Sequence, residues 1–255
     1  MPRPAVNVAV RAARAAGQII LRYMNRLDSL EVVEKQRHDY VSEVDRMAEA
    51  EIIRELRRAY PRDAILGEES GMLGKSRTVW VIDPLDGTRN YISRTGPWSV
   101  CIALYEGDKP RVAVVHEPVA NETFSAIDGG GAFLNGERIT VSGGPPLAEA
   151  LVGVSFQPNP ATKERAGKVI RELLPVCGDI RRLPAALNLV YLAAGRLDGG
   201  LALDTNLWDI AAGALIAREA GVVLGGRGDD FTTDLTVGAA PALWPALSER
   251  VRAAA

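Results

Sequence analysis

A glycine- and proline-rich break, Gly143-Gly144-Pro145-Pro146, divides the chain into two parts with different patterns. Glycine and proline interrupt both helices and strands, so regular structure is not expected to run through this segment. Before the break, short apolar runs separated by turn residues predict antiparallel hairpins, whereas strand and helix patterns alternate after it. We therefore expect a mixed α and β chain. Its N-terminal half covers residues 1–142 and its C-terminal half residues 147–255, and together they form one compact unit.

Two amphipathic helices begin the N-terminal half. Apolar residues at helical spacing predict a helix over residues 5–26, and a second helical pattern starts at Ser42 and ends before Pro61. The extended segments expected in this half are Leu30–Glu34, Ala64–Leu66, Thr78–Ile82, Trp98–Tyr105, Arg111–His116, Phe124–Ala126 and Ala132–Leu134. The dipeptide Asn135-Gly136 is typical of a type I′ hairpin turn.

The C-terminal half alternates between the two kinds of element. The expected strands are Leu151–Phe156, Ile180–Arg182 and Leu197–Leu203. The expected helices are Thr162–Leu174, Ala185–Ala194, Trp208–Ala220 and Pro241–Arg252.

Charge and hydrophobicity narrow the class of protein. The 30 Lys and Arg residues nearly balance the 32 Asp and Glu residues, which argues against a protein that coats nucleic acid or binds membranes through a basic patch. No apolar run approaches the ~20 residues that span a bilayer, and no apolar signal segment precedes a small-residue cleavage site. We therefore expect a cytoplasmic protein that contacts neither membrane nor nucleic acid directly.

Cysteine and histidine usage limits the metal chemistry. His38 and His116 are too few for a multi-histidine zinc site, and Cys101 and Cys177 lie in apolar stretches typical of buried free thiols. Any metal would therefore be a hard ion bound by carboxylates.

Two acidic strings follow strand candidates, and they contain the highest concentration of candidate functional side chains in the sequence. One is Gly67-Glu68-Glu69-Ser70, and the other is Asp83-Pro84-Leu85-Asp86-Gly87-Thr88. In the second string a proline restricts the turn, which can direct two carboxylates and the Leu85 carbonyl at one point. Oxygen ligands clustered in this way suit Mg²⁺, and the Gly87-Thr88 amides could hold an anion beside it.

Two further carboxylates have structural alternatives. Asp45 lies three residues after Ser42, a spacing typical of an acidic partner in a helix capping box. Asp209 follows Trp208 at the start of an apolar helix, where an aspartate complements the helix dipole. Spacing alone leaves both alternatives open.

Three motifs together resemble the signature motifs of the inositol monophosphatase family. They are Gly67-Glu68-Glu69-Ser70, Asp83-Pro84-Leu85-Asp86-Gly87-Thr88 and Trp208-Asp209-Ile210-Ala211-Ala212-Gly213, in the family's order and spacing. The resemblance extends from about Val6 to Val251, and the N-terminal half is especially similar to the bacterial members called SuhB.

The resemblance implies a layered αβαβα sandwich of the sugar-phosphatase type, shared with fructose-1,6-bisphosphatase, and Mg²⁺-dependent hydrolysis of a phosphate monoester. On this basis one Mg²⁺ would be held by Glu68, Asp83 and the Leu85 carbonyl, and a second by Asp83, Asp86 and Asp209. A weaker third ion would use Glu68 and waters. Asp45 and Thr88 would position and deprotonate the attacking water. Asp86 and the amides of Gly87 and Thr88 would lie at the bound phosphate.

The chain departs from this family on the substrate side. Members that hydrolyse inositol phosphates carry a glutamate seven residues before the aspartate of the Trp-Asp motif, where this chain has Ala202. Asp204 is the nearest replacement, with a solvated turn residue as the alternative. The loop Leu183-Pro184-Ala185 replaces the usual Gly-Ser/Thr-Ala and is one residue shorter. The pair Arg181-Arg182 is typical of a solvated basic pair, with contact to an anionic partner as the alternative.

The expected substrate is inositol monophosphate or a similar small polyol phosphate. The alternatives within the family are histidinol phosphate, fructose bisphosphate, adenosine bisphosphate and NADP. An alternative of another class is an interaction protein, because some SuhB-like relatives bind transcription-elongation factors and their phosphatase activity can be incidental. The resemblance also implies a homodimer and inhibition by lithium.

Overall fold

The computed structural model describes residues 3–24, 32–36, 39–141, 143–228 and 232–255, without the side chains of 3, 32–36 and 39–42. Its helices are α1 (Arg3–Met24), α2 (Glu43–Ala59), α3 (Thr88–Ser93), α4 (Pro160–Leu173), α5 (Ala185–Ala193), α6 (Leu207–Glu219) and α7 (Trp244–Ala254), with a short 3₁₀ helix, η2 (Leu147–Glu149). Within the described ranges, no helix is both long and apolar enough to cross a membrane.

The strands form two large sheets and a hairpin. The hairpin pairs β1 (Val32–Gln36) with β2 (Asp39–Ser42). The larger sheet has the order β10-β9-β8-β7-β6-β5-β3-β4. Its strands are β3 (Ala64–Gly67), β4 (Gly71–Leu73), β5 (Thr78–Asp86), β6 (Ser99–Glu106), β7 (Lys109–Glu117), β8 (Glu122–Ile127), β9 (Gly131–Leu134) and β10 (Glu137–Ile139). The smaller sheet has the order β12-β11-β13-β15-β14, from β11 (Leu151–Phe156), β12 (Asp179–Arg182), β13 (Gly199–Leu203), β14 (Val223–Gly225) and β15 (Leu235–Ala239).

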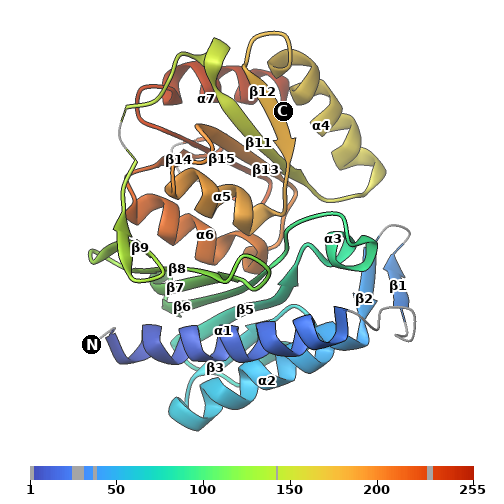
Figure 1. Cartoon of the computed structure of the whole chain (residues 1–255), viewed down its shortest axis with the longest axis vertical. Coiled ribbons are helices and arrows are strands. Elements are labelled where there is room, and N and C mark those ends of the chain that lie inside the picture. Colours follow the sequence, from blue (N-terminus) through green and yellow to red (C-terminus); the bar gives the residue numbers. More distant parts are fainter. Residues whose placement is uncertain (1–2, 25–31, 37–38, 142, 229–231) are drawn as a thin grey trace.

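Helices and sheets alternate through the molecule in five layers. Figure 1 shows α1 and α2 below the larger sheet, α5 and α6 between the two sheets, and α4 and α7 beyond the smaller sheet. This is the αβαβα arrangement that the resemblance implies.

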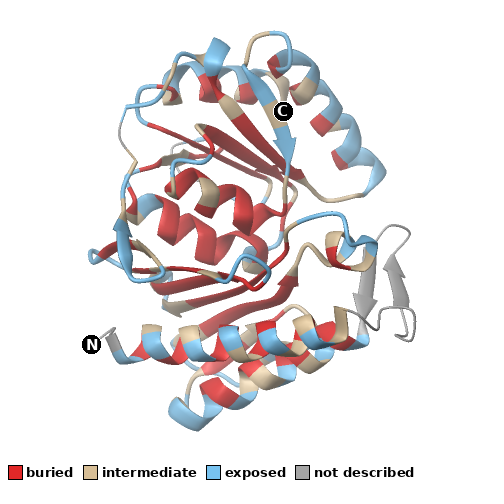
Figure 2. Ribbon diagram, viewed as in Figure 1, coloured by how far each residue is buried: buried red, intermediate tan, exposed pale blue. Residues whose placement is uncertain are grey.

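The central strands have both faces covered, which explains their nearly continuous apolar sequences. In β6, Cys101 and Ala103 pack toward α5 and α6, whereas Val100 and Ile102 pack with α1 and α2. The middle helices α5 and α6 are buried on nearly all sides, because the larger sheet covers one side of this layer and the smaller sheet covers the other (Figure 2). A third apolar cluster joins the smaller sheet to α4 and α7.

Most expected elements are confirmed, including the antiparallel hairpins of the N-terminal half. At the Asn135-Gly136 turn, φ is 51° and 88°, as a type I′ turn requires. The first-helix prediction extends to residues 25–26 and the extended segment begins at 30–31, both outside the described residues.

The sequence patterns missed α3, β2, β4, β10, β14 and β15, and the last helix begins at Trp244 rather than at Pro241. Pro245 occupies its first turn, where proline is tolerated because the first amides have no partner within the helix. The division into halves 1–142 and 147–255 that together form one compact unit stays a prediction. The expected cytoplasmic location also stays a prediction.

Candidate active site

An irregularity at the end of β5 places the first carboxylates. The register against β6 shifts between Asp83 and Asp86, so β5 has one residue more than its partner at this point. Pro84 lies within this bulge, a position in a sheet that tolerates a missing N–H. The amide of Leu85 donates to Asp83 Oδ1 at 2.8 Å, and this bond closes the turn. The acidic string is therefore a bulge with a defined shape.

Glu68 comes to the same place because β3 and β5 are parallel neighbours. Ala64 pairs with Val79 and Gly67 with Ile82, so the carboxyl ends of the two strands meet at one edge of the sheet. The amide of Glu68 donates to the Ile82 carbonyl at 3.3 Å. The two acidic strings thus become neighbours through sheet pairing.

A buried glutamate on α2 fixes the turn that carries Glu68. The Glu49 carboxylate accepts from the amides of Glu69 and Ser70, both at 2.9 Å. The approach is so close that a Cβ at Gly67 would lie 2.6 Å from Glu49 Oε2. A side chain at position 67 would therefore displace the Glu49 carboxylate from these amides. Glu49 supports the site without lining the cleft described below.

Asp45 and Thr88 lie together beside these strings. Thr88 Oγ1 is 3.0 Å from the Leu85 carbonyl oxygen and 3.4 Å from Asp45 Oδ2. Because the hydroxyl has one proton, the shorter bond to Leu85 is the better one. Carboxylate oxygens of Asp45, Glu68 and Glu69 lie within 4.8 Å of one another. The capping alternative for Asp45 involves the side chain of Ser42, which lies outside the described part.

Asp209 reaches the site from the C-terminal half. It is the third residue of α6, and its Oδ2 accepts from the amide of Asn206 at 2.8 Å and from Gln157 Nε2 at 3.2 Å. Asp209 therefore caps its helix and also lines the cleft, so the structural and functional alternatives are compatible.

Asp86 joins the two halves directly. Its Oδ2 accepts from the amide of Ala186 at 2.8 Å, in the first turn of α5. The first amides of a helix lack partners within it, and they favour negative charge. Gly87, between Asp86 and Thr88, has φ of 97°, and a Cβ there would lie 2.8 Å from Pro184 Cγ. The bulge and the start of α5 thus pack as one unit.

The carboxylates strongly affect one another. The pKa of Asp83 is raised well above its usual range, first by burial, since the residue is only 1% exposed. The negative charges of Glu68, Asp86, Asp209 and Asp45 raise it further. Burial raises the pKa of Asp86 to about 7, although the amides of Ala186 and Ala185 oppose the rise. Like charges in a poorly solvated site repel, and a divalent cation among them would remove the repulsion. The donor set of carboxylate and carbonyl oxygens fits a hard ion such as Mg²⁺.

Most of these groups line a cleft of about 160 Å³, and Asp45 lies beside it without lining it. Its acidic lining consists of Glu68, Asp83, Asp86 and Asp209, and these are the carboxylates among the described residues that line it. The other lining residues are Leu85, Gly87, Thr88, Arg89, Asn90, Ser155, Phe156, Gln157, Pro158, Arg182, Leu183, Pro184, Ala185, Thr205 and Asn206. The cleft therefore combines carboxylates with two arginines and neutral polar groups.

The structure thus brings together every residue singled out for the site, from Asp45 to Asp209. The sequence patterns gave no role to Glu49 or Gln157, and they did not mark Glu69, whose carboxylate lies near those of Asp45 and Glu68, as a candidate metal ligand. Acidic spacing within the Gly67–Ser70 string could have suggested Glu69, but no local signal marks the other two. On the substrate side, Asp204 does not replace the missing glutamate, because its carboxylate accepts from Thr162 and Arg165 of α4.

The chain matches a known protein family over its whole length. The model of the inositol monophosphatase family matches residues 1–255. The chain belongs to the inositol monophosphatase family. Among curated relatives, a protein of Xylella fastidiosa named Nus factor SuhB is 46% identical over 223 residues, which are 87% of this chain and 81% of the relative.

Solved structures of this family have the same fold. The extragenic suppressor protein SuhB of Bartonella henselae superposes with a TM-score of 0.92 at 33% identity, over 98% of each chain. An inositol monophosphatase of Thermotoga maritima gives 0.88 at 32% identity, over 100% of this chain and 98% of that structure. The chain therefore has the sugar-phosphatase fold that the motifs implied, and its family membership supports a phosphatase.

Proposed function

We propose that the protein is a Mg²⁺-dependent phosphomonoesterase acting on a small phosphorylated metabolite. The observation that carries the proposal is the convergence of carboxylates from both halves on one cleft, where their mutual repulsion calls for cations. Phosphate monoesters hydrolyse extremely slowly in water because an anionic ester repels the nucleophile. An active site for them must therefore supply positive charge and an activated water.

The proposed ligands follow the assignments made from the motifs. Glu68, Asp83 and the Leu85 carbonyl would hold one Mg²⁺, Asp83, Asp86 and Asp209 would hold a second, and a weaker third would use Glu68. When bound, Mg²⁺ would offset the charge of the ester and increase the acidity of water.

The remaining proposed roles belong to protein groups alone. If Thr88 donates its proton to the Leu85 carbonyl, then Thr88 Oγ1 and Asp45 Oδ2 can each accept a hydrogen from one water molecule. Asp45 would then take the proton as the water attacks. The amides of Gly87 and Thr88 would donate to phosphate oxygens, and Asp86 would lie beside them.

Phosphate release tests this proposal. The panel is inositol, glycerol, histidinol, fructose and adenosine phosphates, each with and without Mg²⁺, on wild type, Asp83→Asn and the control Asp128→Asn. Asp128 is half-exposed and pairs with Arg111 away from the cleft. We expect Mg²⁺-dependent release that falls ~10²-fold or more in Asp83→Asn, because one group would serve both ions. The control should keep its rate, and circular dichroism should show every variant folded. More than about a tenth of the rate in folded Asp83→Asn would contradict a bridging Asp83.

A second function rests on the names of the relatives. The Xylella fastidiosa protein is called a Nus factor, so we also propose that this chain binds transcription-elongation factors. A pull-down from native cell extract, with wild type and Asp83→Asn as bait, separates the two functions. Recovery of RNA polymerase or its elongation factors by both baits would support a binding role that does not need catalysis, and recovery by neither would contradict it.

A further inference from the structure

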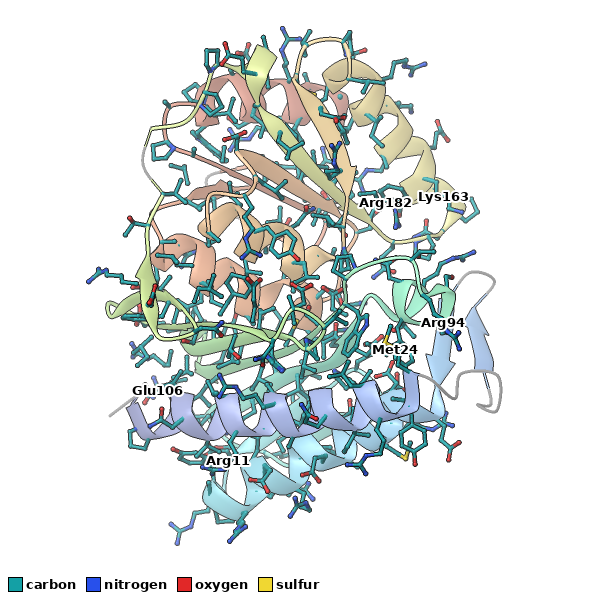
Figure 3. The ribbon with its side chains drawn as sticks, viewed as in Figure 1. Arg11, Met24, Arg94, Glu106, Lys163 and Arg182 are labelled. Carbon is teal, nitrogen blue, oxygen red and sulfur yellow. The ribbon has the colours of Figure 1, made fainter. Side chains whose placement is uncertain are left out.

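Two arginines, one from each half of the chain, line the same cleft as the carboxylates. Arg89 belongs to α3, and Arg182 is the last residue of β12, at the end of that strand nearest α3 (Figure 3). Both are exposed enough to meet a ligand. The roles proposed for the metal ions and the reacting phosphate do not involve these two arginines. Their place in the cleft therefore needs a separate explanation.

Arg182 is held in a defined orientation. Its Cζ lies 4.3 Å from the centre of the Phe156 ring, and its Nη2 donates to the Phe156 carbonyl at 3.3 Å. Phe156 also lines the cleft. A guanidinium has five N–H groups in a planar fork, so this single bond leaves other groups able to donate. The neighbouring Arg181 instead pairs with Asp179 and does not line the cleft.

The two guanidiniums affect each other. The partial burial of the Arg182 guanidinium, together with the charge of Arg89, lowers the pKa of Arg182. Two cations beside one cleft repel, and an anion bound between them would remove the repulsion, as a cation would among the carboxylates. Arginine suits this task because its fork matches phosphate and carboxylate oxygens in pairs.

Among the described residues that line the cleft, no carboxylate is left over to bind the hydroxyls of a neutral polyol. Ala202, at the position of the family's hydroxyl-binding glutamate, is a β13 residue only 2% exposed. The carboxylates that line the cleft, within the described part of the chain, are those assigned to the metal ions. Specificity must therefore come from neutral polar groups and from the two arginines.

We propose that the substrate is a phosphomonoester that carries a second anionic group, most suitably a second phosphate, and that Arg89 and Arg182 bind that group. This inference rests on the proposed phosphatase function, because it assigns the other end of the same substrate. Arg182 would act as a specificity residue that recognises charge remote from the reacting bond.

Matched substrate pairs test the inference. Fructose 1,6-bisphosphate is compared with fructose 1-phosphate, and 2-phosphoglycerate with glycerol 2-phosphate, on wild type, Arg89→Gln, Arg182→Gln and the control Arg181→Gln. We expect wild type to favour the doubly anionic member of at least one pair by about tenfold in kcat/KM. Each cleft variant should raise KM for that member by about tenfold and change kcat little, with a much smaller change for its partner. The control should match wild type.

A binding measurement separates this inference from the proposed function. Calorimetry with Asp83→Asn, which should hydrolyse its ligand at least ~10²-fold more slowly than wild type, compares the same pairs with and without the added Arg182→Gln change. If the protein binds the doubly anionic member more tightly and Arg182→Gln removes that preference, the arginine site is supported. Absence of hydrolysis of every substrate would contradict the proposed function and leave this support for the arginine site unchanged. Equal affinity for both members, or equal losses for both on substitution, would overturn the inference.

Discussion

At Gly87, the backbone of the N-terminal half packs against Pro184 of the C-terminal half. The φ of 97° at Gly87 disfavours any side chain, and a Cβ would also meet Pro184. Gly129 offers a matched control, because its φ is +70° and no atom lies within 4 Å of an added Cβ. We expect Gly129→Ala to cost about 1 kcal/mol of unfolding free energy and Gly87→Ala about 1–3 kcal/mol more. Only Gly87→Ala should also lower kcat.

Urea denaturation of both variants and phosphate release measure these effects. Equal losses of stability in the two variants would mean that the backbone conformation, and not the contact with Pro184, limits position 87.

His116 gives a pH dependence that is independent of the metal site. It is 2% exposed, and its Nδ1 lies 2.9 Å from the Glu122 carbonyl, so this nitrogen carries the proton. Burial, assisted by the charge of Arg14, lowers the pKa of His116 from its usual 6.5. The unfolded chain therefore binds the proton more readily, and this contribution to stability is present above pH 6.5 and lost as the pH falls below it.

His116→Gln tests that pH dependence. At pH 7.5 we expect the variant to be less stable than wild type by about 1–2 kcal/mol, because a buried hydrogen bond and its packing are altered. The difference between the two proteins should narrow by pH 5. A difference that stays constant between these pH values in urea denaturation would contradict the lowered pKa.

Residues whose role is local could be recognised in the sequence, whereas those that act across the fold could not. Asp83 and Asp86 lie in one short acidic string in which a proline predicts a turn. Asp209 lies in the separate Trp-Asp motif. Glu49 is an ordinary acidic residue within a helical pattern, and only packing shows that it holds the amides of Glu69 and Ser70. Gln157 likewise gains its role from contact with Asp209.

At the scale of elements, α2 supports the turn between β3 and β4. Glu49→Gln replaces one accepting oxygen by an N–H₂ group that would face an amide N–H. We expect a loss of about 1–3 kcal/mol in stability and about a tenfold fall in phosphate release, because the turn carries Glu68. Glu55→Gln is the control, since Glu55 is on the same helix and pairs with Arg11 and Arg54 instead. Equal effects on activity in both variants would contradict a specific role for Glu49.

Elements with a strong period were predictable, and those defined by their partners were not. The amphipathic helices and the hairpins of the larger sheet follow from apolar spacing and turn residues. β15 lies between β13 and β14 and is antiparallel to both, an insertion that depends on strands distant in the sequence. β14 has only three residues, too few for a recognisable period.

At the scale of the whole molecule, the candidate site exists only when both halves are in place. Asp209 comes from α6, whereas Glu68, Asp83 and Asp86 come from the larger sheet and its loops. The bond from Ala186 to Asp86 joins residues 100 positions apart. Motif order could indicate a shared site, but the contact that aligns the halves follows from the five-layer packing.

The central claim is that the carboxylates gathered from both halves bind divalent cations. Calorimetric titration of Mg²⁺ into wild type, Asp83→Asn and Asp128→Asn tests it most directly. We expect saturable binding in wild type and in Asp128→Asn, and binding weakened by about 100-fold or more in Asp83→Asn, because the charges of four other carboxylates act on Asp83. Binding of Mg²⁺ by Asp83→Asn as tight as that of wild type, or no saturable binding in wild type, would contradict the account.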